Sequence, residues 1–265
     1  MADPVAHPTP YPEVNVLVHK LLSDVQDILG DQFVAMYLYG SLATGDFDPR
    51  RSDVDFVVVT GDELGDDLVA RLQAMHARIA AGDSPWANEL EGSYLPRHAM
   101  RRFEPANAHY PMIDRGGGLR VQQHHSDSVI RLHILYERGV VVAGPSPRTL
   151  IDPVPADELQ HAVLDLIYAW WAPMLDDPAR LHSRDYQDYA VLTMCRVLYT
   201  LQHGVIVSKP FAARWAQATL DARWFPIVEH ALAGRDDPPA DTLNDTLDFI
   251  RFTVERIGQR GIHPQ

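Results

Sequence analysis

This sequence has little cysteine, little lysine and no long apolar run. Its single cysteine, Cys195, excludes an internal disulfide and any zinc site built from several cysteines. No apolar run approaches the ~20 residues that a membrane-spanning helix needs. Residues 1–12 also lack the charged-then-apolar order of a signal peptide. We therefore expect a cytoplasmic protein that does not enter a membrane.

Positive charge is scarce as well. The 265 residues include 36 acidic and 23 basic side chains, giving a net charge of −13, and only two of the basic ones, Lys20 and Lys209, are lysines. A general nucleic-acid binder needs a basic face that releases counterions from phosphates, so the composition argues against that class. The acidic excess fits either a cationic small-molecule substrate or plain solubility.

The spacing of apolar residues predicts alternating helices and strands in the first half of the chain. The predicted elements are a helix over 14–29, strands over 33–39 and 53–60, a helix over 64–81, strands over 90–95 and 110–113, a helix over 126–137 and a strand over 140–143. Residues 40–52 form a turn-rich connection in this prediction.

The amino-acid composition changes at residues 145–155, which hold four prolines. Beyond them strand-like runs nearly vanish, and helical patterns cover 156–174, 185–203, 210–220, 225–233 and 241–257. We expect two domains, residues 1–152 and 153–265. The first is an α/β domain with a mixed sheet and flanking helices, and the second is an all-α helical bundle.

Two carboxylates and a Gly-Ser pair carry the chemical signal. Asp53 and Asp55 lie in a predicted strand, where side chains two residues apart share a face and stand roughly 6.6 Å apart. They repel each other unless a cation lies between them, and carboxylate oxygen is the ligand that Mg²⁺ prefers. Gly40 and Ser41 end the preceding strand in a turn whose amides and hydroxyl can approach an anion. An anion site beside a divalent metal is what nucleotidyl transfer needs.

Each part of this pattern is weak by itself, because Asp-x-Asp is common at exposed strand ends and Gly-Ser pairs are commoner still. Together, in strand–turn–strand order after a long amphipathic helix, they favour function over chance. The adjacent histidines His124 and His125 would face opposite sides of a strand, so they do not suggest a shared metal ion.

The run LYGSLATGDFDPRRSDVDFVVV resembles the signature of the nucleotidyltransferase superfamily typified by DNA polymerase beta. The chain as a whole, including LIDPVP and AVLTMCRVLYTLQHGVIVSKPFAARWA, is similar to the aminoglycoside adenylyltransferases that modify streptomycin and spectinomycin. The resemblance implies a nucleotidyltransferase domain followed by a helical domain, with ATP and a small cationic molecule as substrates. We also expect a monomer. The implied reaction transfers AMP from Mg-ATP to an antibiotic hydroxyl and releases pyrophosphate.

The resemblance also implies roles for residues of the first half. Gly40 and Ser41 would hold the ATP triphosphate with Ser52 nearby, and Asp53 and Asp55 would bind Mg²⁺. Ser52 can equally be the cap of its turn.

A third carboxylate, Glu91, would be both a metal ligand and the general base for the attacking hydroxyl. Glu89, two residues earlier on the same strand face, is the alternative to Glu91. From the helical half, Arg196 and Lys209 would reach the nucleotide phosphates.

The substrate side of the site is less well marked. Trp170 matches the tryptophan on which a cationic sugar would pack, and Asp185 is the nearest acidic residue by position. The competing interpretation places Trp170 and Trp171 in the bundle core and makes Asp185 a solvated helix-cap residue. Two other functions stay open: nucleotide transfer to another small molecule or to a protein, and a non-catalytic nucleotide-binding module.

Overall fold

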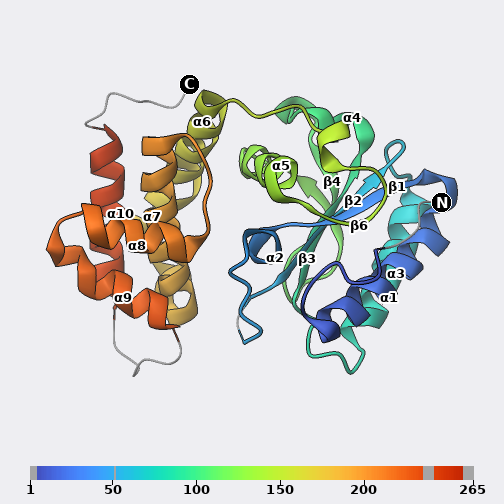
Figure 1. Ribbon diagram of the computed structural model, residues 1–265, viewed down its shortest axis with the longest axis horizontal. Coiled ribbons are helices and arrows are strands. Elements are labelled where there is room, and N and C mark those ends of the chain that lie inside the picture. The colour runs from blue at the N-terminus through green and yellow to red at the C-terminus, as the bar shows by residue number, and fades with distance from the viewer. Residues whose placement is uncertain (1–4, 51, 235–241, 259–265) are drawn as a thin grey trace. The chain divides into compact units, whose positions relative to one another are not determined.

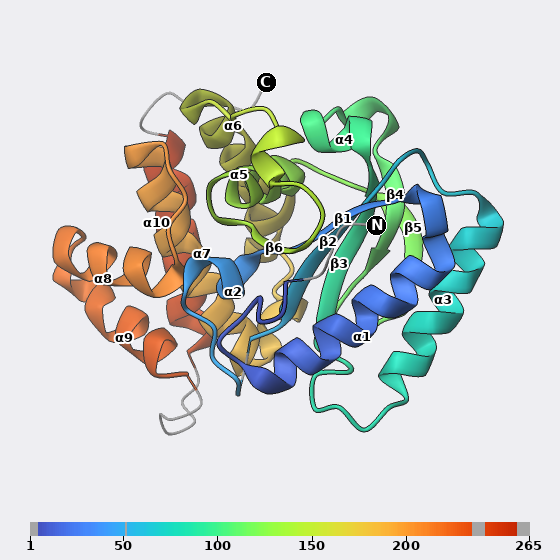
Figure 2. The ribbon, with the colours of Figure 1, turned by 45° about the vertical axis from the view of Figure 1, so that its right-hand side comes forward.

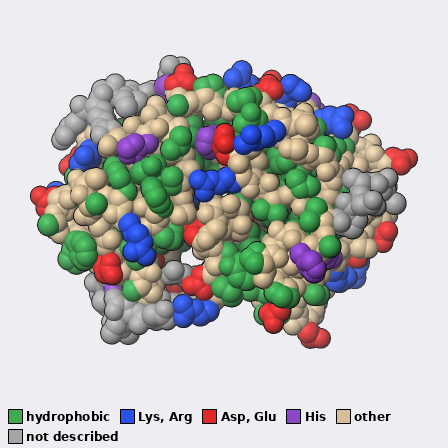
Figure 3. Space-filling model, in the orientation of Figure 1, with side chains coloured by type: hydrophobic (Ala, Val, Ile, Leu, Met, Phe, Trp, Pro, Cys, Tyr) green, Lys and Arg blue, Asp and Glu red, His purple; other side chains and the backbone are tan. Residues whose placement is uncertain are grey.

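The structure is a computed structural model that describes residues 5–50, 52–234 and 242–258, with the side chain of residue 107 left out (Figure 1). The chain divides into two compact units, residues 1–154 and residues 155–265. None of the described helices is long and apolar enough to cross a membrane. On the face shown in Figure 3, the Lys and Arg side chains are scattered among acidic and apolar ones and form no single basic patch.

The first unit is built on a six-stranded mixed sheet with the order β5-β4-β3-β2-β1-β6. Only the β2–β3 pair is parallel; the other pairs of the sheet are antiparallel. A parallel pair needs a crossover connection, which here is the helix α3 (Asp66–Ala80) between the two strands. The strands are β1 (Phe33–Leu38), β2 (Val54–Thr60), β3 (Leu90–Pro96), β4 (His109–Ile113), β5 (Arg120–Gln123) and β6 (Val140–Ala143).

Helices cover both faces of this sheet. On one face α1 (Pro12–Leu29) and α3 (Asp66–Ala80) lie side by side, as Figures 1 and 2 show, over a core that includes Phe56 and Val58 of β2. On the other face α5 (Asp127–Arg138) packs its Leu132 and Leu135 against Val57. Because both faces are covered, every residue of β2 is buried.

The unit also holds two short helices, α2 (Gly40–Thr44) and α4 (Arg97–Arg101). The sequence pattern predicted only a turn-rich connection at α2, because five residues are too few for periodicity to register. It likewise missed β5, an edge strand that pairs only with β4 and has mostly exposed side chains.

The second unit is mostly helical. Its helices are α6 (Ala156–Leu166), α7 (Arg184–His203), α8 (Lys209–Thr219), α9 (Phe225–Ala233) and α10 (Leu243–Gly258). The long helix α7 carries much of the core, including Met194 and Cys195. Position 241, the start of the last predicted helix, lies outside the described residues. The predicted fold class, an α/β domain followed by a helical domain, is confirmed.

One predicted helix, 156–174, is divided in the structure. The α-helix ends at Leu166, a π-helical turn follows over Ile167–Trp171, and a 3-10 turn covers Ala172–Leu175. Pro173 has no backbone N–H to continue the α-helical hydrogen bonds, which accounts for the change of winding. Apolar periodicity does not distinguish these windings, so it predicted one continuous helix.

Candidate active site

Three carboxylates lie at the same end of the parallel pair β2–β3. Asp55 is the second residue of β2, Asp53 precedes that strand, and Glu91 is the second residue of β3. The register pairs Asp55 directly with Glu91. Residues paired across neighbouring strands project to the same face of the sheet, and so do residues two apart along one strand. The register therefore sets Asp55 beside Glu91, 36 positions away in the sequence, and Asp53 lies just before the start of β2.

Gly40 contacts this acidic group through its backbone. The amide of Tyr39 donates a hydrogen bond to the carbonyl oxygen of Asp55 over 3.1 Å, which brings the end of β1 beside β2. Gly40 has a φ of +58°, and a Cβ atom added to it would lie 1.7 Å from Oδ2 of Asp55. The carboxylate occupies the space that any side chain would need, so this position requires glycine for two independent reasons.

The two serines predicted at the phosphates differ in their partners. The Ser41 hydroxyl, in α2, is buried and has no hydrogen-bond partner in the described part of the chain. Such a group normally finds an acceptor, and a phosphate oxygen would satisfy it. The Ser52 hydroxyl accepts a hydrogen bond from the Asp48 amide over 2.9 Å, and the Ser52 amide donates to the Asp48 carbonyl. Ser52 therefore closes a turn ahead of β2.

The pKa of the Tyr39 phenol reflects the negative charges around it. Burial raises the pKa of its phenol well above the usual value, and the carboxylates Asp55, Glu91 and Asp53 raise it further. Arg131, on α5, acts in the opposite direction. Sequence reasoning overlooked Tyr39 although it directly precedes the Gly-Ser pair. It also overlooked Arg131, whose signal was a charged residue at a core-facing position of a helix, three residues after the buried Ser128.

The residues present suit Mg²⁺ in chemistry and number. No group of three or more His, Cys, Asp or Glu side chains in the described ranges is arranged as a ready-made metal cage. Mg²⁺ does not require one, because it usually takes one or two carboxylates and completes its octahedron with water and substrate phosphates. The aligned pair Asp55 and Glu91, with Asp53 beside them, meets that description.

Glu89 and Glu91 have different surroundings. Glu89 lies just before β3, where its carboxylate forms an ion pair with Arg115 and its carbonyl oxygen accepts from the Val54 amide over 2.7 Å. Glu91 is the register partner of Asp55. The structure thus gives Glu89 a role in holding the strand ends and sets Glu91 beside the other acids.

The second unit carries the two predicted phosphate-binding cations on separate helices. Arg196 is half-buried in the middle of α7, and no hydrogen bond or ion pair to it is found within the described residues. Lys209 begins α8, where the Ser208 side chain caps the helix, and its Nζ lies 4.1 Å from the ring centre of Tyr189.

Trp170 and Trp171 occupy contrasting positions. Trp171 is buried in the core, whereas Trp170 is 39% exposed. The Trp170 indole donates to the Tyr186 hydroxyl over 3.0 Å, and the Arg180 guanidinium lies 4.2 Å from the centre of its ring. This ring therefore already packs against a cation of its own chain.

The first turns of α7, which supply the hydrogen-bond partner of Trp170, carry aromatic and acidic residues. The rings of Tyr186 and Tyr189 are tilted by 40° with their centres 5.6 Å apart, and Asp185 beside them in the sequence is exposed. Sequence reasoning overlooked both tyrosines, which follow Asp185 by one and four residues and so lie on adjoining parts of the helix surface.

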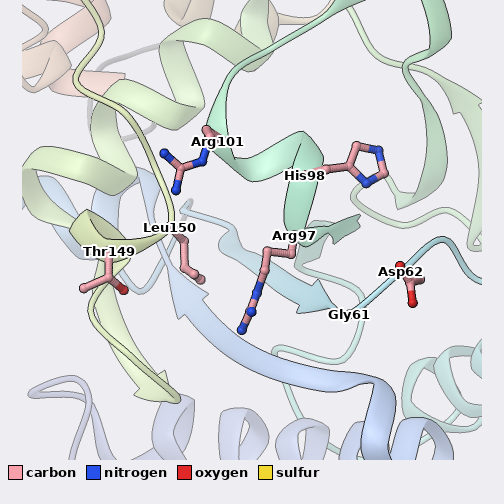
Figure 4. Close-up of a pocket in the computed structure, with 7 residues that line it drawn as sticks. All are labelled: Gly61, Asp62, Arg97, His98, Arg101, Thr149 and Leu150. Atoms are coloured by element: carbon pink, nitrogen blue, oxygen red, sulfur yellow. The ribbon is translucent and has the colours of Figure 1, made fainter.

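A cavity of about 470 Å³ lies at the opposite end of the strands, where β2 and β3 finish (Figure 4). It contains none of the predicted site residues. Its arginines come from α4, and Arg101 is paired with Asp152 over 2.8 Å, so part of the positive charge is already compensated. The residues that line the cavity are Gly61, Asp62, Arg97, His98, Arg101, Thr149 and Leu150.

Two models of known protein families match the chain, one in each half of it. Residues 18–81 match the model of the nucleotidyltransferase domain, and residues 149–258 match that of the aminoglycoside adenylyltransferase C-terminal domain. Both matches support the aminoglycoside adenylyltransferase family for this chain. The first match contains Gly40, Ser41 and the Asp53–Asp55 pair, while Glu91 lies outside both.

Curated relatives in this family are similar over nearly their whole length. The aminoglycoside (3'') (9) adenylyltransferase of Shigella flexneri is 26% identical, over 92% of this chain and 95% of the relative. The enzyme of the same name from Rhizobium radiobacter is 29% identical, over 92% and 93%. A spectinomycin 9-adenylyltransferase of Staphylococcus aureus is 25% identical, over 81% and 82%.

A solved structure shows the same fold. The spectinomycin adenyltransferase of Enterococcus faecialis, crystallised with ATP and spectinomycin, superposes with a TM-score of 0.68 at 19% identity. The superposition covers 89% of this chain and 99% of the crystallised one. At this identity the match concerns the fold alone.

Proposed function

We propose that this chain is an ATP-dependent O-adenylyltransferase. It moves AMP from Mg-ATP to a hydroxyl of an aminocyclitol antibiotic, streptomycin or spectinomycin, and releases pyrophosphate. The observation that carries the proposal is the register that sets Asp55 beside Glu91, on the face where Gly40 meets the Asp55 carboxylate. Relatives named as aminoglycoside and spectinomycin adenylyltransferases support the acceptor class, and the ATP-bound neighbour supports the co-substrate.

The acidic residues have two tasks in this reaction. Asp53, Asp55 and Glu91 would hold Mg²⁺, which when bound supplies positive charge to the attacking and leaving oxygens. Glu91 also accepts the proton of the substrate hydroxyl. The hydroxyl oxygen then forms a bond to the α-phosphorus of ATP while the bond from that phosphorus to the bridging oxygen breaks, so pyrophosphate departs.

The remaining residues bind the nucleotide. Gly40 lets the backbone approach the triphosphate, and the buried Ser41 hydroxyl, which has no partner in the described structure, donates to a phosphate oxygen. Ser52 holds the turn that leads into Asp53. Arg196 and Lys209 of the helical unit supply charge-assisted hydrogen bonds to the phosphates.

Trp170 and Asp185 bind the cationic acceptor in this proposal. The exposed face of Trp170 and its contact with the Arg180 guanidinium support the choice, because the ring already accepts a group of the kind that streptomycin carries. Asp185 supplies negative charge on the neighbouring helix turn.

Pyrophosphate release from Mg-ATP tests the function directly. The panel is streptomycin, spectinomycin, kanamycin and lincomycin, with ATP alone as the blank. We expect release with streptomycin, spectinomycin or both. If ATP binds but no drug of the panel releases pyrophosphate, the antibiotic acceptor is wrong, and another acceptor or a binding-only role takes its place.

Asp53→Ala tests the metal assignment. This variant should keep its circular dichroism spectrum and lose pyrophosphate release, because Asp53 precedes β2 and contributes nothing to the buried core. Turnover that persists in Asp53→Ala would exclude Asp53 as a required ligand.

A further inference from the structure

Arg131 is a buried cation with unusual partners. It lies on α5 and only 6% of it is exposed. Its guanidinium donates to the Ser93 hydroxyl over 2.8 Å, to the Ser128 hydroxyl over 2.7 Å and to Nδ1 of His124 over 3.1 Å. All three acceptors are uncharged, since burial and the nearby Arg131 lower the pKa of His124 to about 3. In the described chain no carboxylate lies within ion-pair distance of Arg131.

A buried cation without a directly paired anion is costly, so its charge must be balanced at longer range. The acidic group supplies that balance. Ser93, which holds the guanidinium, is two residues after Glu91 on β3, and the two side chains therefore share a face of the sheet. Asp55 is in turn the partner of Glu91 in the β2–β3 register.

We propose that Arg131 is a positioning residue: a buried counter-charge that holds Asp53, Asp55 and Glu91 together before a divalent cation binds, and that weakens the binding of that cation. The inference rests on the proposed metal-binding role of these carboxylates. Neutral acceptors are essential to it, because a directly paired carboxylate would cancel the positive charge, whereas Ser93, Ser128 and His124 orient it and leave it intact.

Two variants of Arg131 separate its charge from its packing. Arg131→Lys keeps the charge and loses the forked hydrogen bonds, and Arg131→Gln loses the charge. Thermal unfolding is measured without metal, and binding of Mn²⁺ alone is followed by electron paramagnetic resonance. Metal-free Arg131→Gln should unfold at a lower temperature than Arg131→Lys. A purely structural role predicts the reverse order, because a buried lysine costs more than a buried amide.

Metal binding should change in the opposite direction to stability. Removing a nearby positive charge strengthens the attraction of the carboxylates for a divalent cation, so Arg131→Gln should bind Mn²⁺ with a Kd about fivefold lower than Arg131→Lys. Arg138→Gln is the matched control. It removes the same charge from an exposed position of the same helix, where water screens it, and should alter neither measurement.

Ser128→Asp keeps the test decisive if Arg131→Gln does not fold. An aspartate here would pair with Arg131 in place and suits the first turn of α5, so it should lower the Mn²⁺ Kd without loss of stability. The proposal is overturned if Arg131→Gln binds Mn²⁺ no more tightly than Arg131→Lys and Ser128→Asp binds Mn²⁺ no more tightly than the unmodified chain. If Asp55→Asn retains wild-type Mn²⁺ binding, the metal assignment fails instead, and the order of the metal-free unfolding temperatures alone then decides the role of Arg131.

Discussion

Replacing Gly40 by alanine should slow catalysis about 100-fold by displacing one carboxylate. Two costs arise from the structure. Holding a non-glycine residue at a φ of +58° costs about 1–2 kcal/mol of stability. The added Cβ would also lie 1.7 Å from Oδ2 of Asp55, where real contacts stay beyond 3.0 Å, so the carboxylate must move by more than 1 Å. A misplacement of that size costs about 100-fold in rate.

Gly45→Ala is the control for this prediction. Gly45 has a φ of +83°, so alanine brings a similar backbone cost, but its added Cβ would meet no atom within 4 Å. The assay is pyrophosphate release from Mg-ATP with the accepted antibiotic, alongside thermal unfolding of both variants. We expect similar losses of stability, with activity reduced only in Gly40→Ala. Equal activity in the two variants would refute the idea that Gly40 exists to accommodate Asp55.

Three further predictions concern the base, the pH dependence of stability and the substrate. Glu91→Gln should lower kcat by about 10²–10⁴-fold, whereas Glu89→Gln should mainly lower the unfolding temperature; the opposite pattern would make Glu89 the base. Burial lowers the pKa of His76 to about 4, so below its unfolded pKa of 6.5 the unfolded chain binds a proton that the folded chain does not. Stability should therefore fall by about 2 kcal/mol between pH 7 and pH 5 through His76, and urea titrations should show a smaller fall in His76→Gln. Trp170→Ala should raise the KM for streptomycin about tenfold and leave the KM for ATP unchanged, as steady-state rates will show; an unchanged antibiotic KM would remove Trp170 from the substrate site.

Much of the first unit was predictable because its signals are local. The apolar periodicity of α1 and α3 and the β-branched run of β2 each lie within one stretch of sequence, and each element formed where its pattern predicted. Elements shorter than one period of such a pattern, α2 above all, were missed. Where a proline changes the winding, as at Pro173, the periodicity continued past the real end of the helix.

Some residues of the candidate site could likewise be predicted from the sequence, and others could not. The Gly-Ser and Asp-x-Asp motifs could be found from the sequence because each lies within a few consecutive residues. The choice between Glu89 and Glu91 could not, since both lie on the same strand face by spacing. Only the register with β2 places Glu91 opposite Asp55, and only the fold brings Arg115 to Glu89.

The sequence by itself therefore indicated the class of fold, the resemblance to the adenylyltransferases and the candidate acidic residues, because these depend on periodicity and short motifs. Tertiary structure decided how their charges are arranged. It filled the space beside Gly40 with the Asp55 carboxylate and turned Arg131 inward to the sheet, where Ser93, Ser128 and His124 hold it. Electrostatic and steric contacts depend on distances between segments far apart in the chain, and those distances exist only once the strands have paired.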